Sequence, residues 1–138
     1  MEKPDLQNMS VLVVDPHDGA AMLFLRMAKQ LGFGAGNLAK TVTEATDLLK
    51  GNAFSLVIVD YDTDDGDSLS LMSHIRAGYS GWTTTSSIPF VLTTGRPDRE
   101  IVMAARDAGV DALLLKPVSM KQFEEKILGV MASHLLKK

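Results

Sequence analysis

Residues 54–60 read Phe54-Ser55-Leu56-Val57-Ile58-Val59-Asp60, an apolar run that ends at a carboxylate. Its apolar residues do not alternate with polar ones, which is typical of a strand covered on both faces in a parallel sheet. Three similar runs also end at polar residues: Val11–Asp15, Phe90–Thr94 and Ala112–Lys116. Ligands of open parallel sheets bind outside the carboxyl ends of the strands. We therefore expect Asp60 to lie at a ligand-binding edge.

Amphipathic segments separate these runs and predict five helices. The first begins at Asp18-Gly19. A capping box of Thr41 and Glu44 starts the second, Asp67-Ser68 caps the third, Pro97 starts the fourth and Ser119 opens the last. The expected buried faces are Ala20, Leu23, Phe24, Met27, Ala28 and Leu31; Ala45, Leu48 and Leu49; Leu71, Met72 and Ile75; Ile101, Ala104, Ala105 and Ala108; and Phe123, Ile127 and Met131. The methionines expected in the core are Met22, Met27, Met72, Met103 and Met131.

With a weaker strand over Ala35–Lys40, strands and helices alternate five times along the chain. This alternation predicts an α/β fold, a three-layer doubly wound sandwich around a five-stranded parallel sheet. The expected strand order is 2-1-3-4-5, the flavodoxin-like arrangement. We expect residues 1–138 to form a single domain, because 138 residues suffice for one core.

Composition narrows the classes of function. The chain has no cysteine, which excludes disulfides, thiolate metal sites and cysteine nucleophiles. A net charge of −3 provides no basic surface for direct nucleic-acid binding. The chain has neither an apolar run of the roughly 20 residues that span a bilayer nor the pattern of a signal peptide at its start. We therefore expect a cytoplasmic protein that does not contact membranes.

The polar residues at the strand ends form a set with a definite chemistry. Asp15 and Asp60 should converge on neighbouring strands, and two close carboxylates need a cation between them. Lys116 can supply an ammonium, while Asp15, Asp60 and Asp62 offer the hard oxygen ligands that suit Mg²⁺. Thr94 adds a hydroxyl. A carboxylate nucleophile with a metal, a hydroxyl and a lysine is suited to accept a phosphoryl group.

The motifs from Val11–Asp15 to Lys116-Pro117 resemble the receiver domain of two-component response regulators, over essentially the whole chain. The resemblance implies that Asp60 is the phosphoacceptor, with Thr94 and Lys116 as its catalytic partners and Mg²⁺ as cofactor. It also implies a cis-prone Pro117 and a switch region that includes Gly95 and Leu113. The partners implied are a histidine kinase or phosphotransfer protein and a downstream protein or effector domain, and such domains often dimerise. A receiver is a phosphoacceptor and not an enzyme with a separate substrate.

Three features depart from the pattern of these receivers. Pro16 stands where a second acid normally binds the metal, so Mg²⁺ affinity should fall unless Asp18 or Asp62 compensates. Leu113 stands where receivers usually have an aromatic residue that reports the phosphorylation state. The usual proline-containing loop after the phosphoacceptor is replaced by Asp64-Asp65-Gly66, and residues 78–87 look like a short insertion.

Other interpretations remain open for the chain and for single residues. Pro16 and Leu113 also fit a degenerate receiver that binds partners without phosphorylation. A phosphatase with an aspartate nucleophile would need a second acid, and Asp62 is formally at the right spacing. The acidic loop from Asp62 to Asp67 is either a solvated, helix-capping loop or a calcium site, and it lacks the closing glutamate of a calcium loop. His17 either contacts the bound phosphoryl group or is merely exposed, and Trp82 is either a packing anchor or a partner contact.

Overall fold

A computed structural model describes residues 5–96 and 98–136 of the chain. Strands and helices alternate along these residues, as the sequence predicts. The elements are β1 (Ser10–Val14), α1 (Asp18–Leu31), β2 (Ala35–Ala39), α2 (Val42–Gly51), β3 (Leu56–Asp60), α3 (Ser68–Ala77), β4 (Phe90–Thr94), α4 (Arg99–Ala108), β5 (Ala112–Leu115) and α5 (Met120–Leu136). Among the described helices, none combines the length and the apolar character that a bilayer crossing requires.

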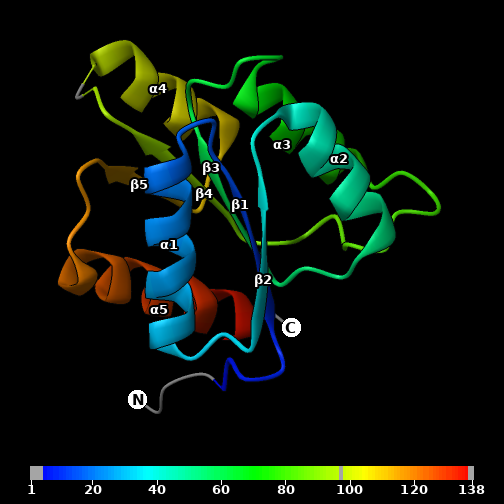
Figure 1. Cartoon of the computed structure of the whole chain (residues 1–138). Coiled ribbons are helices and arrows are strands. Elements are labelled where there is room, and N and C mark those ends of the chain that lie inside the picture. The colour runs from blue at the N-terminus through cyan, green and yellow to red at the C-terminus, as the bar shows by residue number, and fades with distance from the viewer. Residues whose placement is uncertain (1–4, 97, 137–138) are drawn as a thin grey trace.

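The five strands form one sheet in the order β2-β1-β3-β4-β5, and all neighbouring strands are parallel. In Figure 1, α1 and α5 lie on one side of this sheet, and α2 and α3 lie on the other. This arrangement confirms the predicted doubly wound sandwich and its strand order. Because the strands are parallel, their carboxyl ends meet at one edge of the sheet.

The sheet separates two apolar cores. Val11, Val13, Ile58 and Val91 point toward α1 and α5, where Phe123 packs within a ring-centroid distance of 6.2 Å of Phe24. The alternate strand residues point toward the other helices; this second core includes Leu12, Val14, Val57, Val59, Leu92, Leu71, Met72, Ile75 and Ala105. Both faces of the central strands are therefore covered, which explains why their sequences are apolar without alternation.

Side chains at the helix starts confirm the predicted caps of α2 and α3. Thr41 Oγ1 accepts a hydrogen bond from the Glu44 amide at 3.1 Å. The carboxylate of Asp67 accepts one from the Leu69 amide at 2.9 Å. The fourth helix is capped by Asp98, whose carboxylate accepts from Glu100. The predicted helix start at Pro97 lies outside the described residues.

The buried face of α1 differs from the prediction. Ala21 is buried, whereas Leu23 is 50% exposed and Ala20 only half-buried. Met22 in the same helix is 43% exposed, so its assignment to the core is wrong. The face of α1 that packs against the sheet centres on Ala21, Phe24 and Ala28. It is narrower than the set of apolar residues that the helical spacing predicted to be buried.

A narrower face also explains the misplaced residues of α4. Ile101 and Ala105 are buried as expected, but Ala108 and Met103 are exposed and Ala104 is half-buried. The other predicted core methionines, Met27, Met72 and Met131, are buried. Helical spacing therefore predicted the centre of each buried face better than its edges.

The long connection between α3 and β4 folds back onto the end of α2. The Thr83 amide donates to the Lys50 carbonyl at 3.0 Å, and the Thr84 amide donates to the Leu49 carbonyl at 3.1 Å. Trp82 packs against the second core, with the Lys50 ammonium 5.8 Å from its ring centroid. These contacts support the interpretation of Trp82 as a packing anchor.

Candidate functional site

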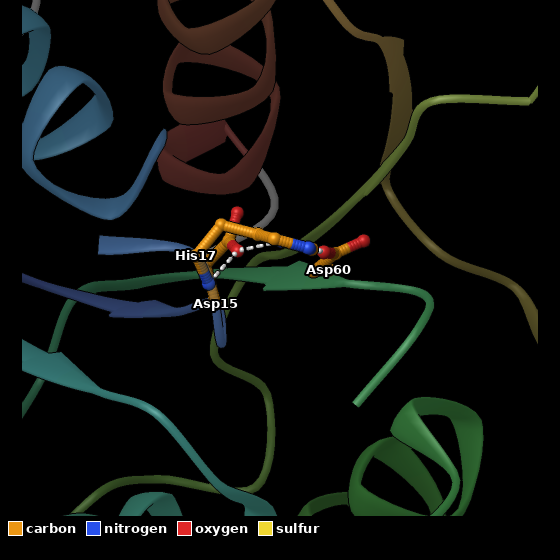
Figure 2. Close-up of side chains that lie close together, drawn as sticks. All are labelled: Asp15, His17 and Asp60. Carbon is orange, nitrogen blue, oxygen red and sulfur yellow. Dashed lines mark hydrogen bonds and ion pairs between the residues drawn. The ribbon is translucent and has the colours of Figure 1, made fainter. Parts of the chain in front are cut away.

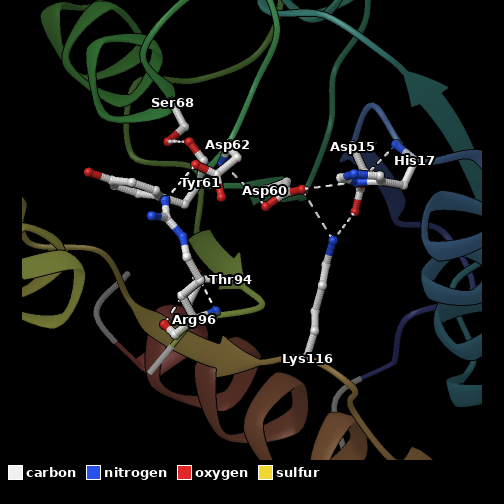
Figure 3. Close-up of polar contacts among 9 residues, drawn as sticks. All are labelled: Asp15, His17, Asp60, Tyr61, Asp62, Ser68, Thr94, Arg96 and Lys116. Carbon is white, nitrogen blue, oxygen red and sulfur yellow. Dashed lines mark hydrogen bonds and ion pairs between the residues drawn. The ribbon is translucent and has the colours of Figure 1, made fainter. Parts of the chain in front are cut away.

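Asp15 and Asp60 lie side by side at the carboxyl edge of the sheet. Val14 pairs with Val59 across β1 and β3, so the residue that follows each is also brought into register. Asp15 is 1% exposed and Asp60 is 3% exposed. The predicted convergence of these two carboxylates is confirmed (Figure 3). Both side chains are almost completely removed from water.

Lys116 supplies a cation to both carboxylates. Its Nζ lies 2.6 Å from Asp15 Oδ2 and 3.2 Å from Asp60 Oδ2. Its backbone amide donates to the Thr94 carbonyl at 2.8 Å, which extends the pairing of β5 with β4 up to the site. Pro117 follows in a cis peptide bond, as the sequence resemblance implies. The lysine is thus fixed by the sheet at the position where the two acids converge.

The electrostatics of Asp60 reflect this crowded, buried position. Burial raises the pKa of Asp60 above the ordinary aspartate value, the ammonium of Lys116 partly offsets this effect, and the charge of Asp15 adds to it. Lys116 alone therefore does not fully compensate the cost of keeping Asp60 ionised. A further cation at the site would favour the ionised carboxylate.

Thr94 is buried at the end of β4, next to the loop that leads to α4. Its Oγ1 accepts a hydrogen bond from the Arg96 amide at 3.1 Å, within a short turn. In Figure 3, the Lys116 side chain extends to Asp15 and Asp60, whereas Thr94 lies beside Arg96. The hydroxyl is therefore near the carboxyl edge of the sheet but engaged with its own loop.

The side chain of Asp62 turns away from the two buried acids. Its carboxylate lies 2.8 Å from the guanidinium of Arg96, and both side chains are more than half exposed. Its backbone amide lies 3.3 Å from Asp60 Oδ1. Asp62 thus contacts Asp60 through its backbone amide. Sequence reasoning missed Arg96, although its position two residues after Thr94 mirrors that of Asp62 after Asp60.

His17 lies closer to the acids than simple exposure would place it (Figure 2). Its Nδ1 is 3.0 Å from Asp15 Oδ1 and 3.4 Å from Asp60 Oδ2, although 66% of the side chain is exposed. The ligand atoms of Asp15, His17 and Asp60 all lie within 4.8 Å of one another. This cluster is compatible with a metal site. By contrast, Asp18 pairs with Lys40 at 2.8 Å and does not replace the acid missing at position 16.

The acidic loop after β3 is organised as helix caps. Both carboxylate oxygens of Asp65 accept hydrogen bonds at the start of α2, from the Val42 amide at 2.7 Å and the Thr43 amide at 3.0 Å. Asp67 caps α3, and the Ser68 hydroxyl donates to the Tyr61 carbonyl at 3.2 Å (Figure 3). These contacts favour the capping interpretation of the loop over a calcium site.

The two residues assigned to the switch region occupy different environments. Leu113 in β5 is half-buried and packs against the second core. Gly95 is exposed in the loop between Thr94 and α4. Leu113 thus places an aliphatic side chain at the half-buried position where an aromatic one was described as usual.

Comparison with known proteins assigns the chain to a protein family. Residues 11–128 match the family described as the response regulator receiver domain. The chain is 26% identical to chemotaxis protein CheY-3 of Vibrio cholerae serotype O1 over 88% of this chain and 90% of that protein. It is 24% identical to chemotaxis protein CheY of Pseudomonas aeruginosa over 86% and 93% of the two chains.

Solved structures show the same fold. The CheY-like response regulator receiver domain protein from Methanospirillum hungatei superposes with a TM-score of 0.82 at 19% identity, covering 94% of this chain and 98% of that one. A receiver domain protein from Clostridium thermocellum gives a TM-score of 0.81 at 18% identity, covering 95% and 100%. Because the family match spans most of the chain, the protein belongs to the response regulator receiver domain family.

Proposed function

We propose that this domain accepts a phosphoryl group on Asp60 from a phosphohistidine of a histidine kinase or phosphotransfer protein. An oxygen of Asp60 attacks the phosphorus, the phosphorus–nitrogen bond of the donor breaks, and its electron pair returns to the donor imidazole. The product is an acyl phosphate on Asp60. The domain acts in this proposal as a phosphoacceptor rather than as an enzyme with a separate substrate.

One observation carries this proposal: the buried Asp60 carboxylate lies 3.2 Å from Lys116 Nζ at the carboxyl edge of the sheet. Phosphoryl transfer depends mainly on positioning and on neutralising the charge of the phosphoryl oxygens. The ammonium of Lys116 lies where the oxygens of the transferred phosphoryl group would be placed. The Thr94 hydroxyl, once its O–H turns away from the Arg96 carbonyl, is the second donor from the neighbouring strand.

The residues present also fit a divalent metal. Asp15, Asp60 and the backbone carbonyl of Asp62 are the oxygen donors assigned to it, and Mg²⁺ is the ion that such donors usually bind. A bound divalent ion would neutralise charge on the transferring phosphoryl group. Pro16 contributes no carboxylate, so we expect Mg²⁺ to bind more weakly than it would with a third acid.

Phosphorylation of Asp60 would alter a partner-binding surface through the loop before α4. Phosphorylation adds nearly two negative charges beside Lys116 and Thr94. The surface formed by α4, β5 and α5 is the proposed contact for a downstream protein, an effector domain or a second copy of the chain. Because Leu113 replaces the usual aromatic side chain, we propose that the readout depends on the Thr94–Arg96 loop. We expect the domain to act in the cytoplasm.

Incubation with Mg²⁺ and acetyl phosphate, followed by intact-mass measurement, tests the proposal. We expect the wild-type chain to gain one phosphoryl group and Asp60→Asn to gain none. An unmodified wild type, or equal modification of the variant, would refute it. Hydrolysis of a phosphate ester with multiple turnovers would instead support the phosphatase alternative, in which Asp62 acts as the second acid.

A second candidate function is a protein-interaction module that does not need phosphate. The absence of a carboxylate at Pro16 and of an aromatic side chain at Leu113 favours it. In this case a partner would bind equally well to the wild type and to Asp60→Ala. A clear loss of affinity in Asp60→Ala, measured with the phosphorylated wild type as reference, would argue against this alternative.

A further inference from the structure

The chain after β1 turns so that residue 17, and not residue 16, faces the acids. Asp15 Oδ1 accepts a hydrogen bond from the His17 amide at 2.8 Å, which closes a short turn around Pro16. Such turns, in which an aspartate binds the amide two residues on, are well suited to proline at the central position. The turn holds the His17 imidazole over the two carboxylates, as Figure 2 shows.

The two distances from the His17 ring to the acids suit ligands of one metal ion. His17 Nδ1 lies 3.0 Å from Asp15 Oδ1 and 3.4 Å from Asp60 Oδ2. Ligand atoms at about 2.1 Å from a common ion lie roughly 3.0 to 3.4 Å apart when their bonds form octahedral or tetrahedral angles. An ion could therefore replace the contacts of the His17 ring with Asp15 and Asp60.

The net negative charge of the cluster also favours a bound cation. Asp15 and Asp60 are both buried, and the contacts described for them include one permanent cation, Lys116. Two carboxylates and one ammonium sum to one net negative charge. Buried charge without compensation is costly, so a bound cation would stabilise the site.

We infer that Asp15, His17 and Asp60 form a site for a divalent transition-metal ion of the Co²⁺, Ni²⁺ or Zn²⁺ type, with His17 as a nitrogen ligand. Imidazole favours these ions, whereas Mg²⁺ prefers oxygen ligands. His17 thus replaces, with a different donor atom, the acid that Pro16 removes. This inference rests on the divalent-cation site of the proposed function and changes which ion that site prefers.

The test is a titration of the full chain with Co²⁺, followed by visible absorption, and with Mg²⁺, followed by calorimetry. We expect Co²⁺ to bind more tightly than Mg²⁺ and His17→Ala to lose Co²⁺ affinity by at least ~10-fold, since even indirect supports of metal ligands are worth that much. Mg²⁺ affinity should change little in His17→Ala. His17→Asp should reverse the preference by restoring a third carboxylate. The matched control is His74→Ala, an exposed histidine on α3.

The outcomes separate this inference from the proposed function. Absence of Co²⁺ binding to the wild type, or equal Co²⁺ affinity in the wild type and His17→Ala, would overturn the inference. Phosphorylation of Asp60 with Mg²⁺ would stand in either case. If Co²⁺ binding depends on His17 but Asp60 accepts no phosphoryl group with either ion, the metal site is supported and the proposed function fails.

Discussion

The guanidinium of Arg96 lies 2.8 Å from the carboxylate of Asp62. This contact joins the loop after β3, the strand that ends at the proposed acceptor Asp60, to the loop after β4, which leads into α4 (Figure 3). The Asp62 amide contacts Asp60, and the Arg96 amide contacts Thr94. We therefore expect phosphorylation of Asp60 to affect the loop before α4 through these contacts.

Arg96→Ala should weaken this coupling without unfolding the protein. Exposed ion pairs contribute at most about 1 kcal/mol to stability, so the free energy of unfolding should change by less than that. We expect phosphorylation to produce smaller amide NMR shifts in α4 of the variant than in the wild type. Arg99→Ala, in the first turn of α4, is the control. Equal shifts in the wild type and Arg96→Ala would show that the contact plays no part.

Lys116→Met should destabilise the fold. Removal of one partner from a buried ion pair leaves uncompensated charge and costs about 3 kcal/mol or more. Urea unfolding at neutral pH measures the loss, and added divalent cation should recover part of it. The matched control is Lys40→Met, which breaks the exposed pair with Asp18 and should change the stability far less. A loss in Lys116→Met as small as in the control would contradict the described electrostatics.

Asp60→Asn should stabilise the metal-free protein at neutral pH, because it removes a buried charge that Lys116 does not fully compensate. The pKa of Asp60 is raised in the folded state, chiefly by burial, so the folded protein binds this proton more tightly than the unfolded chain. The wild type should lose stability as the pH rises from about 4 through the raised pKa of Asp60. Urea unfolding in the presence of a chelator checks this.

The gain from Asp60→Asn should accordingly shrink toward about pH 4, where the unfolded chain also protonates. A destabilised variant at neutral pH, or a gain that does not depend on pH, would contradict the role of burial in raising this pKa.

Asp65→Ala should destabilise the protein by about 1 kcal/mol, because Asp65 caps α2 from a distant loop. Hydrogen bonds from Thr43 and Val42 lower the pKa of Asp65, so its contribution is present above the unfolded pKa of about 4 and disappears as the pH falls through the lower folded pKa. The difference between variant and wild type should therefore vanish in strong acid. Asp64→Ala, at the exposed neighbouring position, should have little effect at any pH.

The sequence predicted the sheet and the centre of the site for the same reason. Apolar runs that end at Asp15, Asp60 and Lys116 define parallel strands, and parallel register brings the ends of such strands together. The distances from Lys116 to the two acids follow from that register. The positions of these three residues do not depend on contacts with distant loops.

The remaining features depend on tertiary contacts that local patterns do not encode. The capping of α2 by Asp65 joins residues more than 20 positions apart, and the pair of Asp62 and Arg96 joins two loops. The position of His17 depends on the turn at Pro16, whose effect the sequence suggested only as the absence of an acid. The exposed Leu23 reflects how much of α1 the sheet covers, which helical spacing cannot specify.

The most direct test of the account is to locate the modified residue after treatment with acetyl phosphate and Mg²⁺. Borohydride reduces an acyl phosphate, and mass spectrometry of peptides from the reduced protein then identifies its position. We expect the reduced residue at Asp60 and a strong decrease of modification in Lys116→Met. Modification at another carboxylate, such as Asp62 or Asp15, or no modification at all, would contradict the central claim that Asp60 is the phosphoacceptor.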